Sequence, residues 1–166
     1  MKYLLLLCTL AFLIVGCTKH KIKNKCCESS IEITPSSYNK DSVAIWAPQL
    51  FTPNGDGIND VFMLSGIGWT MKHIKIKRGL STVHETSENN WNGAVNGKIK
   101  DGYYKYRMEV ETIHGETLEI RGAVCAFSYR RKRLQEAEEE KYCECSTGDM
   151  IDPVSGFIYG KPAECE

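Results

Sequence analysis

Apolar and polar side chains alternate along the middle of this chain with the two-residue period of β-strands. The clearest alternation covers residues 103–113, and a second one follows Gly115 over residues 117–127, which predicts a hairpin of two half-buried strands. Gly122 interrupts the second strand and predicts a β-bulge there. The inward face of the first strand consists of Tyr104, Tyr106, Met108, Val110 and Thr112.

Shorter segments of the same kind precede this hairpin. Residues 73–77 place Ile74 and Ile76 on one face between basic side chains, and residues 81–85 form a further strand. Three turn dipeptides then reverse the chain within eleven residues: Asn92-Gly93, Asn96-Gly97 and Asp101-Gly102. Many short strands at such spacing predict an all-β fold, an immunoglobulin-like antiparallel β-sandwich.

The domain expected from this pattern covers residues 42–129. Residues 17–41 are polar and rich in Lys, Ser and Asn, which is typical of a flexible tether. Residues 130–166 form a charged segment and a Cys-rich tail. In the charged segment the basic run precedes the acidic run, opposite to what a helix dipole favours, so at most a marginal helix is expected.

Residues 1–16 have the features of a bacterial lipoprotein signal peptide. Lys2 supplies the positive charge, and residues 4–15 are apolar but too few for a comfortable membrane span. The run Ile14-Val15-Gly16-Cys17 resembles the lipobox, whose Cys is acylated and becomes the mature N-terminus. We therefore expect a lipid on Cys17. The alternatives are an ordinary secretory signal cleaved elsewhere and an uncleaved membrane anchor.

Overall charge gives no indication of a nucleic-acid partner, because 21 basic side chains balance 21 acidic ones. The basic run KHKIKNK at residues 19–25 begins two positions after Cys17. Beside an acyl chain, these Lys side chains would be attracted to anionic lipid headgroups, although a solvated tether explains them equally well.

Six cysteines remain besides Cys8 and Cys17, and an even number in an exported chain favours disulfides over free thiols. Cys143-Glu144-Cys145 also suggests a metal site, but no second close pair with flanking His completes a zinc pattern. The disulfide candidates are Cys26, Cys27, Cys125, Cys143, Cys145 and Cys165, whose pairing the sequence leaves open.

The segment FTPNGDGIND at residues 51–60 is the candidate metal site. Asn54, Asp56, the Ile58 carbonyl and Asp60 follow the middle of an EF-hand-like calcium loop. Thr52 and Met63 stand where a complete loop has acidic ligands, so a calcium site would need oxygens from elsewhere. The alternative is an Asx-rich turn in which Asn54, Asp56 and Asn59 cap backbone N–H groups without metal.

FTPNGDGIND also closely resembles the opening motif of the gliding motility-associated C-terminal domain, the type B sorting domain of the type IX secretion system. The resemblance continues in IKIKRG at 74–79, in WNGAVNGKIKDGYYKYRMEV at 91–110 and in RGAVCAF at 121–127. It therefore covers residues 46–129. It implies an immunoglobulin-like sandwich that addresses a secreted adhesin or enzyme to the outer-membrane translocon.

This chain differs from the family plan by its lipoprotein signal, its lack of a cargo domain and its extension beyond residue 129. We therefore expect a resident of the cell envelope, lipid-anchored at the outer membrane. The basic residues after Cys17 do not resemble the acidic export tags of some surface lipoproteins, which favours the periplasmic face.

No catalytic constellation emerges from the sequence, because the four His are scattered and Ser65 and Ser81 have no triad context. We therefore expect a non-enzymatic protein-interaction module whose partner is an envelope protein, such as a type IX secretion component. The alternative is a surface-displayed adhesion or carbohydrate-binding lipoprotein, with Trp46, Trp69 and Trp91 as a glycan platform. A Trp beside an Asn-Gly turn is more often a core anchor.

Overall fold

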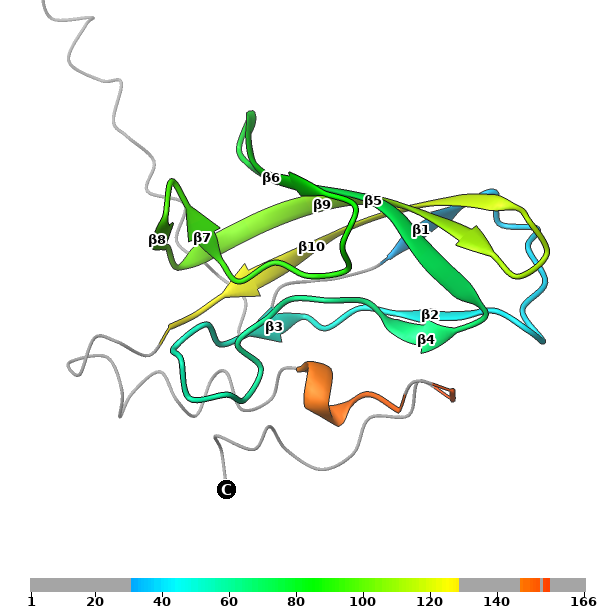
Figure 1. Cartoon of the computed structure of the whole chain (residues 1–166), viewed down its shortest axis with the longest axis horizontal. Helices are drawn as coiled ribbons and strands as arrows, with labels where there is room; N and C mark the ends of the chain where they lie inside the picture. Colours follow the sequence, from blue (N-terminus) through cyan, green and yellow to red (C-terminus); the bar gives the residue numbers. More distant parts are fainter. Residues whose placement is uncertain (1–30, 129–146, 153, 156–166) are drawn as a thin grey trace, which may run out of the picture.

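The computed structural model describes residues 31–128, 147–152 and 154–155 (Figure 1). In order, its elements are β1 (Glu32–Thr34), β2 (Ala44–Trp46), β3 (Leu50–Phe51), β4 (Ser65–Ile67), β5 (Trp69–Arg78), β6 (Ser81–Thr86), β7 (Ala94–Val95), β8 (Lys98–Ile99), β9 (Gly102–Thr112), β10 (Thr117–Ala126) and the 3-10 helix η2 (Gly148–Met150). Among these described residues, no helix is long and apolar enough to cross a bilayer.

The strands form two layers around one hydrophobic core. The larger sheet has the order β1-β10-β9-β5-β6, and β3 joins the end of β10 in parallel. β3 thereby extends the larger sheet into the second layer, where β2 and β4 pair with each other (Figure 1). Fully buried side chains from both layers, such as Phe62, Ile74, Met108 and Ile120, fill the space between them. The all-β antiparallel sandwich is therefore confirmed, with the β3–β10 pair as a parallel exception.

The predicted hairpin of β9 and β10 is confirmed, including its inward face. Tyr104, Tyr106, Met108, Val110 and Thr112 are all buried, since each is at most 4 % exposed. Gly115 has a φ of 78° in the connecting turn, a conformation that glycine adopts without strain. The period-2 pattern thus identified both the strand and the side that faces the core.

The bulge predicted at Gly122 was wrong. β10 pairs with β9 without a register shift from Thr117 to Ala126, and Gly122 lies opposite Tyr106. A Cβ atom on Gly122 would lie 2.2 Å from the Tyr106 hydroxyl oxygen, so the glycine leaves room for the buried ring. The register shifts occur in β5 instead, between Met71 and His73 and between Ile76 and Lys77.

The predicted tether extends too far toward the domain. β1 lies inside residues 17–41, where Ile33 pairs with Ile120 of β10. Ile31, Ile33 and Tyr38 pack against the core, so the folded domain begins earlier than residue 42. Three residues give too little alternation for a pattern search, and it is pairing with a long neighbour that stabilises this strand.

Several predictions concern residues outside the described part of the chain. They include the signal at 1–16, the lipid on Cys17 and the marginal helix that follows residue 129. These remain predictions.

Candidate functional site: the loop at residues 51–60

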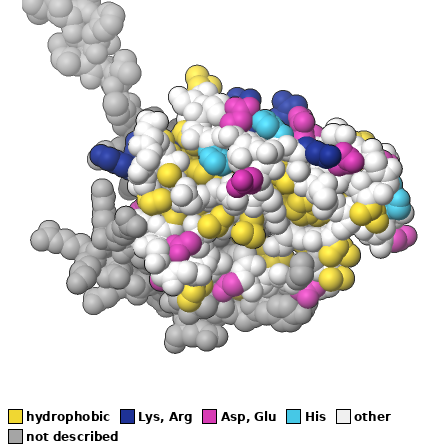
Figure 2. Space-filling view, in the orientation of Figure 1, with side chains coloured by type: hydrophobic (Ala, Val, Ile, Leu, Met, Phe, Trp, Pro, Cys, Tyr) yellow, Lys and Arg dark blue, Asp and Glu magenta, His cyan; other side chains and the backbone are white. Residues whose placement is uncertain are grey.

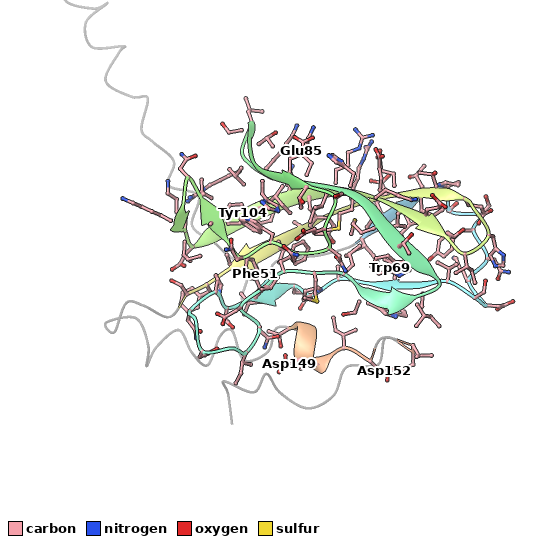
Figure 3. The ribbon with its side chains drawn as sticks, viewed as in Figure 1. Phe51, Trp69, Glu85, Tyr104, Asp149 and Asp152 are labelled. Carbon is pink, nitrogen blue, oxygen red and sulfur yellow. The ribbon has the colours of Figure 1, made fainter. Side chains whose placement is uncertain are left out.

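The loop begins at an aromatic side chain that is anchored in the core. Phe51 is 1 % exposed, and its ring centroid lies 5.3 Å from that of Trp91 and 6.1 Å from that of Phe62. Trp91 is equally buried and contacts the Tyr104 ring edge-on at 4.6 Å (Figure 3 labels Phe51 and Tyr104). These aromatic contacts fix the position of Phe51, the residue at which the loop begins.

Two motifs that are far apart in the sequence meet at this anchor. Phe62 and Trp91 exchange two backbone hydrogen bonds, with N···O distances of 2.9 and 3.0 Å. A Cβ atom on Gly93 would lie 2.9 Å from the Pro53 ring, so Gly93 allows the WNG turn to pack directly on the loop. Trp91 thus serves as a core anchor, and it is not available as part of an exposed glycan platform.

The remaining Trp side chains are also engaged by the fold. The indole N–H of Trp69 donates to the Ala44 carbonyl at 2.8 Å, and its ring packs against the core. Trp46 is partly buried, and its indole nitrogen is fully enclosed. Neither presents a fully open ring for stacking on a sugar.

The other motif residues stabilise the neighbouring end of the sandwich. The Arg78 guanidinium lies 5.6 Å from the centre of the Tyr104 ring and donates to the Asp101 carbonyl at 3.3 Å. The Tyr104 hydroxyl donates to the Lys100 carbonyl at 2.6 Å. The Asp101 carboxylate accepts from the Ser128 N–H at 2.9 Å. Most residues that carry the family resemblance therefore build the fold, and what they expose is the tip of the loop, residues 54–60.

A network of side chain to backbone hydrogen bonds shapes this tip. The two Asp60 carboxylate oxygens accept from the Gly55 and Gly57 N–H groups at 2.6 and 2.8 Å. Asn54 accepts from the Asp56 N–H at 2.9 Å, and Asp56 accepts from the Ile58 N–H at 2.8 Å. These are Asx turns, in which a short polar side chain satisfies backbone donors near it.

The network bears directly on the calcium hypothesis. Asn54, Asp56 and Asp60 lie together as predicted, but each already uses side-chain oxygens to accept backbone N–H groups. The Ile58 carbonyl accepts from the Thr52 hydroxyl at 3.2 Å. Within the described residues, no group of three His, Cys, Asp or Glu side chains is arranged to hold a metal ion. The geometry favours the Asx-rich turn, and the calcium hypothesis stays untested.

The loop also contacts a segment that is distant in sequence. The Asn59 side-chain amide donates to the Asp149 carboxylate at 2.8 Å and accepts from the Asp149 N–H at 3.1 Å. Asn59 adopts a positive φ of 50°, which asparagine tolerates better than most residues. No sequence signal pointed to this contact, because no local pattern relates two residues that are 90 positions apart.

Only Cys125 among the disulfide candidates lies in the described part of the chain, and it is disulfide-bonded. Cys26, Cys27, Cys143, Cys145 and Cys165 lie outside it. The full pairing of these cysteines remains a prediction.

The outer face of the larger sheet carries charges of both signs. Glu85 contacts both Lys75 and His73 at 2.9 Å, and the hydrogen bond from Lys75 is the main reason why the pKa of Glu85 is lowered. On β9 and β10, Arg107 and Arg121 both pair with Glu119. Figure 2 shows acidic and basic side chains next to each other along the upper edge. Such mixed surfaces are typical of a solvated sheet face.

The fold and its exposed loop define an all-β sandwich domain with a loop that is shaped by its own side chain to backbone hydrogen bonds. Residues 45–124, from β2 to β10, match the family model of the CHU_C Type IX secretion signal domain. This part of the chain is thus a domain of that family, and the resemblance drawn from the sequence is confirmed. No curated protein and no solved structure matches the chain significantly.

Proposed function

We propose that this chain is a non-enzymatic, lipid-anchored component of the cell envelope whose sandwich domain binds another envelope protein. The observation that carries the proposal is the type IX secretion signal domain at residues 45–124. Such a domain associates the chain with secretion and with the cell envelope. The lipid anchor, the outer membrane and the interaction role are inferred from the remaining sequence features.

The predicted anchor distinguishes this chain from exported cargo. A sorting domain labels a protein that leaves the membrane, whereas an acylated Cys17 would hold the domain to it. The domain is then a resident binder, with the loop at 51–60 and the sheet edges as its exposed docking elements.

The structure supports the non-enzymatic part of the proposal through the partners of the histidines. His73 pairs with Glu85 on the outer sheet face, and His84 contacts the Asn90 carbonyl. His114 lies 2.7 Å from the Ser42 hydroxyl, but this contact is exposed to solvent, and none of the described hydrogen bonds joins His114 to a carboxylate. A nucleophile needs such an orienting group and an oxyanion site to react efficiently.

Protease digestion of intact cells tests the proposal against the adhesin alternative. We expect the full-length protein to survive external protease and to be degraded only after the outer membrane is permeabilised. A photo-crosslinking amino acid at Ile58, which is 40 % exposed, should then yield a covalent adduct with an envelope protein. The same group at Leu80, which is 99 % exposed on the β5–β6 turn, is the matched control. Loss of the protein from intact cells would overturn the periplasmic binder in favour of the displayed adhesin.

A further inference from the structure

The segment at residues 147–151 lies on the loop as a bound peptide would. Thr147 is fully buried, and Met150 and Ile151 are 6 and 9 % exposed, although the segment has only one short turn of 3-10 helix. η2 lies below the layer of β2, β3 and β4, on the side away from the larger sheet (Figure 1). Figure 3 labels Asp149 on this turn. A short segment of this kind owes its position to its contacts with the domain and not to its own helix propensity.

The loop holds this segment through one residue, Asp149. A single side-chain amide, that of Asn59, donates to the Asp149 carboxylate and accepts from the N–H of the same residue. The Thr147 hydroxyl donates to the same carboxylate and fixes its direction. A Cβ atom at Gly148 would lie 3.7 Å from the Asn59 side-chain oxygen, which is an ordinary van der Waals contact. The chemistry that fits is therefore a peptide whose Asp presents a side-chain oxygen and its backbone N–H to Asn59.

The segment lies outside the residues that match the family model, whereas Asn59 lies inside them. The contact therefore joins the most characteristic loop of the signal domain to an additional part of this chain. Because the side chains of Asn59 and Asp149 are within reach of water, each hydrogen bond can be exchanged for one to solvent or to another peptide at little cost.

We propose that residues 147–151 form an intramolecular strap that occupies the peptide-binding surface of the loop. A Thr-Gly-Asp type peptide of a partner protein, in the same turn conformation as η2, binds this surface when the strap is released. The inference rests on the proposed interaction role, and it adds that release of the strap regulates binding. A site that is occupied in cis for roughly nine-tenths of the time has an apparent affinity for an external peptide that is lowered about tenfold.

The test uses a fluorescent synthetic peptide with the sequence of residues 146–155 and the full chain in detergent. Fluorescence anisotropy should show binding to the Asp149→Ala variant, whose strap is weakened, with an affinity at least about tenfold higher than for the unaltered chain. Asp149→Asn keeps a side-chain oxygen for Asn59 and should behave as the unaltered chain. Asn59→Ala removes the site itself and should not bind the peptide.

Thermal melting and hydrogen exchange separate a strap from a purely structural contact. For a strap, Asp149→Ala leaves the melting temperature unchanged and increases exchange at the Met150 and Ile151 N–H groups, which donate to Thr147 and Gly148 carbonyls. If Asp149→Ala binds the peptide no better than the unaltered chain, or if Asn59→Ala binds it equally well, the strap is overturned. This experiment needs no envelope partner, so its failure would leave the crosslinking result at Ile58 intact, and the reverse also holds.

Discussion

Two tyrosines that are neighbours on one strand face use their hydroxyl groups differently. The Tyr104 hydroxyl donates to the Lys100 carbonyl at 2.6 Å, whereas the buried Tyr106 hydroxyl has no hydrogen-bond partner among the described residues. Burial without a partner costs free energy, because the group gives up its hydrogen bonds to water. The pair therefore offers a controlled comparison within one strand.

We predict that Tyr106→Phe raises the free energy of unfolding by about 1 kcal/mol, because it removes the unsatisfied hydroxyl and relieves its contact with Gly122. Tyr104→Phe is the matched control and should lower it by about 1 kcal/mol, because it leaves the Lys100 carbonyl without its donor. Urea unfolding of both variants measures the difference. Equal effects of the two substitutions would contradict the assignment.

The same tyrosine predicts a loss of stability at alkaline pH. Burial raises the pKa of Tyr106 above the ordinary value of 10.0. The folded state therefore holds the Tyr106 proton more tightly than the unfolded state does. The resulting contribution to the free energy of unfolding is complete below pH 10.0 and is lost as the pH rises toward the pKa of the folded state. Unfolding curves at increasing pH should therefore show a smaller alkaline loss for Tyr106→Phe than for the unaltered chain.

At the tip of the loop, the Asp60 carboxylate holds the backbone in place by accepting two hydrogen bonds from it. Asp60→Ala removes the acceptor for two N–H groups and should lower the free energy of unfolding by about 1 kcal/mol, since these groups remain partly accessible to water. Asp41 is an exposed aspartate before β2, and Asp41→Ala is the control that should leave the free energy of unfolding unchanged.

Because the loop oxygens already accept backbone hydrogen bonds, we expect the same melting temperature in calcium and in EDTA. A higher melting temperature in calcium that Asp60→Ala abolishes would instead establish the metal site.

At the scale of elements, the sequence was most informative where alternation is long. β9 and β10 show their period over ten or more residues, so their faces and their turn at Gly115 could be predicted. β1 has three residues and β3 has two, and both depend on pairing with β10, which no local pattern reveals. Gly122 was misinterpreted because the sequence alone does not show that a bulky Tyr106 lies opposite.

The candidate site was only partly predictable for the same reason. The cluster Asn54, Asp56 and Asp60 follows from local spacing, and so do its Asx turns. The role of Asn59 does not, because its partner Asp149 comes from the tail. Pattern analysis identifies groups that are close in sequence and misses contacts between segments that fold against each other.

The corrected boundary of the domain predicts a stability effect in β1. Ile33→Asp places a charge on the face that packs against the core and should lower the free energy of unfolding by about 2 kcal/mol. Glu32→Ala lies on the opposite, exposed face of the same strand and should change it little. Thermal unfolding monitored by circular dichroism compares the two. An equal response would show that β1 is only a peripheral part of the domain.

At the scale of the whole molecule, acylation of Cys17 would limit which partners are within reach of the domain, because it would set the distance between membrane and domain. Fourteen positions separate Cys17 from Ile31, the first described residue, which is a span of at most about 50 Å when fully extended. A domain held at this distance can meet proteins of its own membrane but cannot accompany a secreted product. Whether Cys17 carries a lipid therefore decides between a resident binder and exported cargo.

We predict that Cys17→Ser abolishes the incorporation of an alkyne-labelled fatty acid and moves the protein out of the membrane fraction. Cys8→Ala, which changes a cysteine inside the signal, is the matched control and should leave both the label and the fractionation unchanged. If Cys17→Ser lost the label but stayed in the membrane fraction, the uncleaved signal would be the anchor. If it kept the label, acylation would occur at another residue. In both cases the domain would still be attached to the membrane. If the unaltered protein itself were unlabelled and soluble, the role of exported cargo would be restored.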